Sequence, residues 1–212
     1  MATIRNLIKN YKSKYGLNIK DSPISKDLEE AKEKRTKVSL DEWLFRCVCN
    51  RKRHQWCLNT NCVNAAVNKL KGKVGMLERS PDFEVLYDSI YELIGRGNTG
   101  ISYSTVYDTA IRFGNSIFPV VNPDKYVYVH RHLVHVANLL LGKGHIENRC
   151  RIQRTLFDKA DKDFELLNSL EIEDFLCIYA DELETLLTAA QQQDKEKAKT
   201  KGLRHEIGNI LY

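Results

Sequence analysis

The stretch GISYSTVYDTAIRFG, residues 100–114, begins as a turn and continues as a helix. Gly100 stands directly before Ile101 and Ser102, and a helix that starts this soon after a glycine turn leaves several backbone N–H groups without intrahelical partners. Those groups, together with the positive end of the helix dipole, form a site suited to a phosphate. The stretch therefore predicts a helix, a tight turn and a second helix that presents its N-terminus to an anion.

The segments on both sides of this stretch are also predicted to be helical. Apolar residues recur every three or four positions in residues 83–94 and again in residues 1–15. Capping boxes at Ser39 and at Asn168, each with a glutamate three residues later, mark two further helix starts. Residues 126–141 form an apolar run interrupted by histidines. The sequence predicts an all-α fold without an internal repeat.

Charge is distributed unevenly along the chain. Residues 1–80 carry 18 Lys and Arg against 8 Asp and Glu, whereas the remainder is acidic on balance. We expect a basic N-terminal helical region over 1–80, a helical core over 81–188, and a charged tail, solvated or disordered, over 189–212. The basic excess favours an anionic partner, with nucleic acid ahead of an acidic protein surface. A solvated helical face would give much the same count.

Part of that excess lies in the segment NRKRHQW, residues 50–56. Arg51, Lys52 and Arg53 stand beside an aromatic residue, which is a pattern suited to contacts with a phosphate backbone. The alternative is a plain solvated turn. We retain both interpretations, and we name these three residues as candidate nucleic-acid contacts.

The chain shows no feature of a membrane or exported protein. Its 212 residues, 42% of them hydrophobic, are enough to bury one core or two small ones. No run of 18 or more apolar residues occurs, and the N-terminus carries charged residues every few positions. We expect a cytoplasmic protein that does not enter a membrane and whose six cysteines are reduced thiols.

Four cysteines raise the question of a zinc site. Cys47, Cys49, Cys57 and Cys62, with His54 between them, supply enough sulfur and nitrogen for one tetrahedral ion. However, Cys47 and Cys49 on a helix would point about 200° apart. The favoured interpretation is a set of small buried thiols, and we expect no metal and no cofactor.

The opening stretch and a later one together resemble a known family. GISYSTVYDTAIRFG, followed by YVYVHRHLVHVANLLLG at 126–142, is similar to the central block of the helix-hairpin-helix DNA glycosylase superfamily, the base-excision enzymes related to endonuclease III. The residues that match are Gly100, Ile101, Thr105 and Val106 in the first part and Val129, His132, Val136, Ala137, Asn138 and Leu140 in the second. A divergent bacterial branch sharing TVYDTAIR and EIEDFLCIY would extend the resemblance to about residue 183. The resemblance implies a two-lobed helical fold that binds double-stranded DNA.

The departures from the family bear on chemistry. Ser102 stands where the family has a second hairpin glycine, and its hydroxyl could itself donate to a phosphate. Ser104 stands where bifunctional members carry a catalytic lysine, so lyase chemistry is not expected because serine has no amine. His130 aligns with the catalytic aspartate that supports a cation-like sugar as the base leaves. A neutral histidine could act as general base towards water near pH 7.

A carboxylate close to His130 could take over the electrostatic role of the missing aspartate. The candidates are Asp108, Asp124 and Asp174. His130 and two of these carboxylates also have structural alternatives. A buried histidine is usually satisfied by one hydrogen bond. Asp108 could pair with Arg112 at i and i+4, and Asp174 with Glu173 could form a solvated face. The histidines at 130, 132 and 135 have no acidic or cysteine partner nearby in sequence, which disfavours a metal.

Two functions from different classes follow. The first is a monofunctional DNA glycosylase that flips a modified or mismatched base and hydrolyses its glycosidic bond with activated water, using His130 and one carboxylate. The second is a catalytically silent DNA-binding module that keeps the hairpin, with Arg96 and the basic loop as phosphate contacts. A protein-interaction scaffold is the third. Candidate DNA contacts at the hairpin are Gly100, Ile101, Ser102, Ser104 and Thr105.

Overall fold

The computed structural model describes residues 3–19, 22–50 and 58–193. Within these ranges the chain is mostly helical, which confirms the all-α prediction. The described residues also contain one small sheet, in which β1 (Tyr126–Tyr128) pairs antiparallel with β2 (Arg151–Gln153) and Val127 lies opposite Ile152. No helix in the described part of the chain is long and apolar enough to span a membrane.

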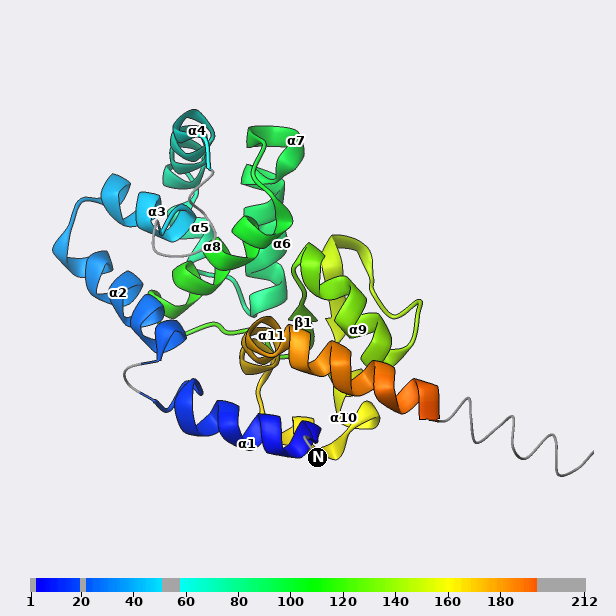
Figure 1. The fold of residues 1–212 in the computed structure, drawn as a ribbon. Helices are drawn as coiled ribbons and strands as arrows, with labels where there is room; N and C mark the ends of the chain where they lie inside the picture. The colour runs from blue at the N-terminus through cyan, green and yellow to red at the C-terminus, as the bar shows by residue number, and fades with distance from the viewer. Residues whose placement is uncertain (1–2, 20–21, 51–57, 194–212) are drawn as a thin grey trace, which may run out of the picture.

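A first hydrophobic cluster is built by consecutive helices from the first half of the chain and buries Trp43, Tyr87 and Phe113. These helices gather on one side of the molecule in Figure 1. They are α2 (Pro23–Lys37), α3 (Leu40–Val48), α4 (Thr60–Lys71), α5 (Val74–Leu77), α6 (Phe83–Ile94), α7 (Arg96–Thr99) and α8 (Tyr103–Asn115).

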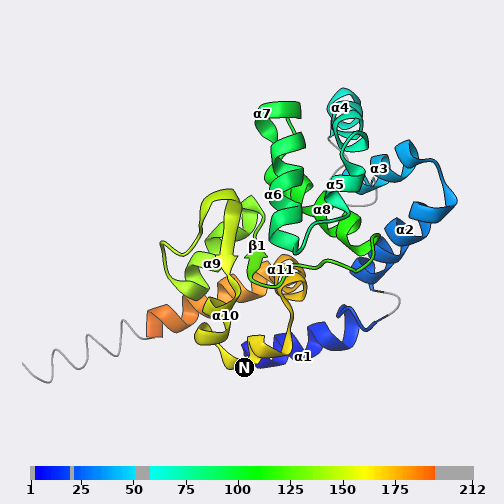
Figure 2. The same cartoon turned by 180° about the vertical axis from the view of Figure 1, so that it is seen from behind.

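A second hydrophobic cluster combines the N-terminal helix with the C-terminal half, and it buries Tyr11, Phe164 and Phe175. Figure 2 shows this half from behind, with the N-terminal helix running along its lower edge. Its elements, besides β1 and β2, are α1 (Ile4–Lys14), η1 (Arg131–Leu133), α9 (Val134–Leu141), η2 (Asn148–Cys150), α10 (Arg154–Ala160), η3 (Lys162–Leu166), α11 (Ser169–Ile178) and helical residues 180–193.

Local sequence signals set several of these helix starts. The Ser39 side chain accepts a hydrogen bond from the backbone N–H of Glu42 at the start of α3. Asn168 and Glu171 form a complete capping box at the start of α11, as the sequence predicts. These contacts satisfy backbone donors that a helix N-terminus would otherwise leave unpaired.

The two clusters meet at β1 and α11. Tyr128 at the end of β1 and Leu170 at the start of α11 belong to the first cluster, while Val127 and Ile172 belong to the second. Arg149 also joins the two halves, because its guanidinium lies 2.5 Å from Asp88 and 2.6 Å from Glu92 on α6. The residues that follow β1 are therefore held at a junction between two packed helical bodies.

These clusters divide the chain differently from the expected segments 1–80 and 81–188. Helix α1 packs with the C-terminal half, and α2 to α5 share one core with α6 and α8. The expected tail over 189–212 begins inside a helix, since residues 180–193 are helical. Residues 194–212 lie outside the described part of the chain.

Candidate functional site

The hairpin turn, residues 100–102, joins α7 to α8. Gly100 has φ +79°, a left-handed conformation that favours glycine, and it ends α7. The Ile101 side chain is fully buried, and its backbone forms an isolated parallel bridge with Gly95. Ser102 is extended and stands as the N-cap of α8. The helix, turn and helix arrangement thus has the local form that the sequence predicts.

The first turn of α8 is partly capped from within the chain. The Ser102 hydroxyl accepts a hydrogen bond from the N–H of Thr105 at 3.4 Å and lies 3.0 Å from the Ser104 hydroxyl. Ser102 and Tyr103 are exposed, whereas Thr105 is buried. Ser102 therefore presents the exposed hydroxyl of the hairpin, Ser104 is half-buried, and the side chains of Ile101 and Thr105 serve packing.

Positive charge near the hairpin comes from Arg96, which is exposed at the start of α7. Lys69 on α4 is close by, because its Nζ donates to the backbone oxygen of Asn98 at 3.4 Å. The candidate contacts Arg51, Lys52 and Arg53 fall in residues 51–57, outside the described residues.

His130 follows β1 and occupies the N-cap position of η1. Its side chain is buried, and its Nε2 lies 2.9 Å from Oε1 of Glu173. Glu173 comes from α11 and is itself only 6% exposed. The same Oε1 accepts a hydrogen bond from the Cys177 thiol at 3.2 Å. The carboxylate beside His130 is therefore Glu173, which is not among the three that the sequence proposed.

The three proposed carboxylates have other surroundings. Asp174 is buried and accepts a hydrogen bond from the Tyr11 hydroxyl of α1 at 3.1 Å. Asp124 is exposed in the segment before β1. Asp108 is half-buried on α8, and its negative charge helps to raise the pKa of the Cys177 thiol, after burial and the nearer Glu173. The alternative of a solvated face for Glu173 and Asp174 is wrong, because both residues are buried.

Arg112 contacts two other helices and also interacts electrostatically with Asp108, its neighbour at i−4 on α8. Its Nε lies 2.9 Å from Asp27 of α2, and its Nη1 donates to the Cys47 carbonyl at 3.0 Å. Burial lowers the pKa of this guanidinium, but the charges of Asp27 and Asp108 outweigh burial and raise it. Arg112 thus remains charged inside the first cluster.

A small void adjoins His130 on the side of the tyrosines. Its volume is about 10 Å³, and it is lined by Tyr87, Tyr103, Ser104, Tyr107, Tyr128, Val129, His130, Arg149 and Cys150. That volume is at the lower limit for one water molecule. The hydroxyls of Tyr87 and Tyr107 are buried and have no hydrogen-bond partner among the described residues. Burial raises the pKa of both phenols, so each remains a neutral donor.

Two residues that line this void, Tyr103 and Arg149, are connected through Tyr91. The guanidinium of Arg149 lies 4.1 Å from the ring centre of Tyr91, and that ring stacks on Tyr103 at 5.3 Å with the two planes 6° apart. Tyr103 is 39% exposed. The residues preceding β2 are strained, since Arg149 has φ +64° and Cys150 φ +58°.

The other two histidines lie nearer the solvent. The ring of His132 is 5.6 Å from the ring of His130, and His135 lies 3.2 Å from Glu184. Both His132 and His135 are exposed. His130 is therefore the histidine of this segment that faces the interior.

The cysteines of the N-terminal half do not converge in the described residues. Cys47 and Cys49 are buried at the end of α3, and burial raises the pKa of the Cys47 thiol to about 12. Neither of them, nor Cys62, belongs to a group of side chains whose potential ligand atoms lie close together. Cys57 and His54 lie outside the described residues.

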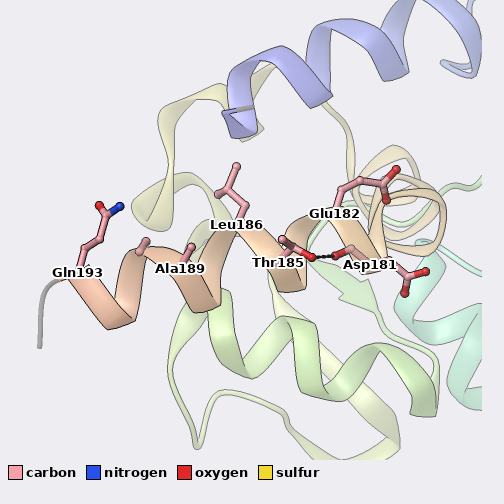
Figure 3. Close-up of a pocket in the computed structure, with 7 residues that line it drawn as sticks. Asp181, Glu182, Thr185, Leu186, Ala189 and Gln193 are labelled. Atoms are coloured by element: carbon pink, nitrogen blue, oxygen red, sulfur yellow. Dashed lines mark hydrogen bonds between the residues drawn. The ribbon is translucent and has the colours of Figure 1, made fainter. Parts of the chain in front are cut away.

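A larger hollow runs along the helix of residues 180–193 (Figure 3). Its volume is about 630 Å³, and its lining includes Leu186, Ala189 and Gln193. The hydroxyl of Thr185 donates to the Asp181 carbonyl, so this polar group is satisfied within the helix. The hollow is an open groove on one helix, and no histidine, cysteine or arginine is among the described residues that line it.

Sequence reasoning missed Glu173 and Cys177 as neighbours of His130. The spacing of Glu173 and Cys177 could have indicated that they lie together, because residues four apart in a helix lie on the same face. Comparison of the chain with family models, with curated proteins and with solved structures finds no match in any of the three.

Proposed function

We propose that the protein is a monofunctional DNA N-glycosylase in which the His130–Glu173 pair activates the water that replaces the base. The observation that carries this proposal is the 2.9 Å contact between His130 Nε2 and a buried carboxylate, beside the hairpin turn and at the junction of two helical bodies. The sequence resemblance supplies the reaction class. The missing aspartate would then be replaced by a histidine with its own carboxylate partner.

The pair has the parts that a general base needs. When Glu173 accepts a hydrogen bond from the Nε2–H of a neutral imidazole, the basic lone pair of that ring belongs to Nδ1. The carboxylate holds the ring in that tautomer and stabilises the imidazolium that forms when a proton is taken from water. The Glu173 charge also offsets the positive charge that develops on the sugar as the base departs. Such assistance is worth about 10² to 10⁴-fold in rate.

The hairpin would hold the DNA backbone near this pair. Ser102, Gly100 and Arg96 are exposed around the turn between α7 and α8, and Ser104 beside them is half-buried. Hydrogen bonds from hydroxyls and backbone amides fix the register of a duplex without reading its sequence. Ser104 offers no amine, so the proposed enzyme leaves an abasic site and does not cleave the strand.

The experiment is a base-release assay on duplexes that carry diverse modified or mismatched bases. We expect abasic sites that become strand breaks only after treatment with alkali. Breaks without alkali would contradict the monofunctional assignment. Intact strands across a broad panel, for protein that binds the same duplexes, would contradict the glycosylase.

A catalytically silent DNA-binding module is the second candidate, and one observation favours it. The void beside His130 has a volume of only about 10 Å³, so no base fits unless residues that line it move. This candidate predicts duplex binding that weakens steeply with salt and is never followed by base release. The base-release assay, run beside a binding assay, separates the two.

A further inference from the structure

Three side chains with metal-binding atoms converge at the junction of the two clusters. A ring nitrogen of His130, a carboxylate oxygen of Glu173 and the Cys177 sulfur all lie within 4.8 Å of one another. Glu173 and Cys177 are one turn apart on α11, while His130 arrives from the end of β1. Oε1 of Glu173 lies 2.9 Å from Nε2 of His130 and 3.2 Å from the sulfur of Cys177. Small side-chain shifts would let an ion replace these hydrogen bonds.

We propose that His130, Glu173 and Cys177 bind a divalent transition-metal ion, with zinc as the best fit. One nitrogen, one oxygen and one sulfur ligand form a set that suits Zn²⁺, whereas Mg²⁺ and Ca²⁺ prefer oxygen ligands alone. Three protein ligands leave the fourth tetrahedral position to water or a substrate atom, which is the arrangement of catalytic zinc sites.

The charges around the site favour a cation. The Glu173 carboxylate and a Cys177 thiolate together supply two negative charges, which match a divalent ion in a buried position. Asp174 and Asp108 add to the negative potential at the Cys177 sulfur, after burial and Glu173, and raise the pKa of the thiol. The metal-free protein therefore holds a protonated thiol, and binding of the ion releases that proton to solvent.

Metal binding and base excision are separable properties of these residues. An ion on His130 Nε2 leaves the ring proton on Nδ1, so the metal-loaded imidazole has no lone pair with which to accept a proton from water. Metal binding is measured without DNA, and its failure would leave the proposed glycosylase intact. Conversely, a protein without glycosylase activity would still be expected to bind the ion.

The test is a titration of the full-length, chelator-treated protein with Co²⁺, a spectroscopic substitute for Zn²⁺. We expect one ion per chain, a thiolate-to-cobalt charge-transfer band and bleaching of that band by Zn²⁺. Cys177→Ser should abolish the band, and His130→Gln should weaken binding at least tenfold. Cys150→Ser, a change at another half-buried cysteine of the same region, should leave both unchanged.

The cysteines of the N-terminal half are the alternative source of a thiolate ligand for the ion. Cys62→Ser is therefore included among the variants. Failure of the wild-type protein to bind Co²⁺ or Zn²⁺ would overturn the proposal. So would a band that survives Cys177→Ser, or one that disappears in Cys62→Ser. Helical circular dichroism is recorded for each variant, and if Cys177→Ser does not fold, His130→Gln carries the same comparison.

Discussion

The hairpin turn and the His130–Glu173 pair lie on neighbouring elements yet are built in opposite ways. The turn is made of consecutive residues, has an exposed hydroxyl at Ser102 and depends on one glycine conformation. The pair joins residues 43 positions apart, is buried, and depends on how α11 packs against β1. A surface feature that holds a ligand can form from local sequence, whereas a buried pair able to move a proton requires the complete fold.

The largest expected effect is on the rate of base release, and it distinguishes Glu173 from its buried neighbour Asp174 on α11. Glu173→Gln keeps the shape but removes the charge that orients and stabilises His130. It should therefore lower the single-turnover rate of base release by about 10² to 10⁴-fold without changing DNA affinity. Asp174→Asn is the matched control, because that carboxylate accepts a hydrogen bond from Tyr11. An equal rate loss in both variants would show that the effect is structural.

The next effect concerns stability in the second cluster. Tyr11→Phe removes the hydroxyl that donates to the buried Asp174, and burial followed by the Asp174 charge raises the pKa of that phenol in the native protein. We expect a loss of about 1 to 3 kcal/mol in the free energy of unfolding, since a buried carboxylate loses a donor. Tyr15→Phe, at the C-cap of the same helix, is the control in a urea titration. A wild-type midpoint for Tyr11→Phe would contradict the assignment.

A smaller effect is expected at the glycine of the turn. Gly100→Ala forces a side chain into a left-handed conformation, which costs about 1 to 2 kcal/mol. Its Cβ would meet only the Cys62 sulfur at 3.5 Å, so the cost comes from the backbone and not from a clash. Gly142→Ala, at φ +85° and with open space around it, should lose similar stability but keep DNA affinity. Equal DNA affinity of the two variants would show that the hairpin is not part of the DNA interface.

The smallest effect is electrostatic. Arg96→Ala removes one exposed cation next to the turn and should reduce the slope of log affinity against log salt by about 0.9, the amount expected for one phosphate contact. Base release at saturating protein should stay unchanged. The measurement is duplex binding by fluorescence anisotropy at several salt concentrations. An unaltered slope would mean that the duplex does not reach α7.

Sequence reasoning succeeded where the signal was local. The all-α class, the capping box at Asn168 and the turn at Gly100 each follow from residues within a few positions of one another. It did not find β1 and β2, because three-residue strands inside an apolar run have no periodicity of their own. Nor did it place α1 with the C-terminal half, since an amphipathic stripe does not specify which partner covers it.

The candidate site shows the same limit. His130 could be singled out only through the proposed resemblance, which aligns it with an aspartate. Its carboxylate could not, because Glu173 stands next to Asp174 and the two differ only in which side of α11 they occupy. Burial of two adjacent acidic residues on one helix needs partners on both sides, and here these are His130 and Tyr11.

The measurement that tests the central claim most directly is single-turnover base release by the wild-type protein and by His130→Gln, at protein concentrations that saturate the same duplex. If His130 with Glu173 replaces the family's aspartate, the wild-type protein should release the base and the variant should be slower by at least two orders of magnitude at equal occupancy. Equal rates for the two proteins would contradict the account.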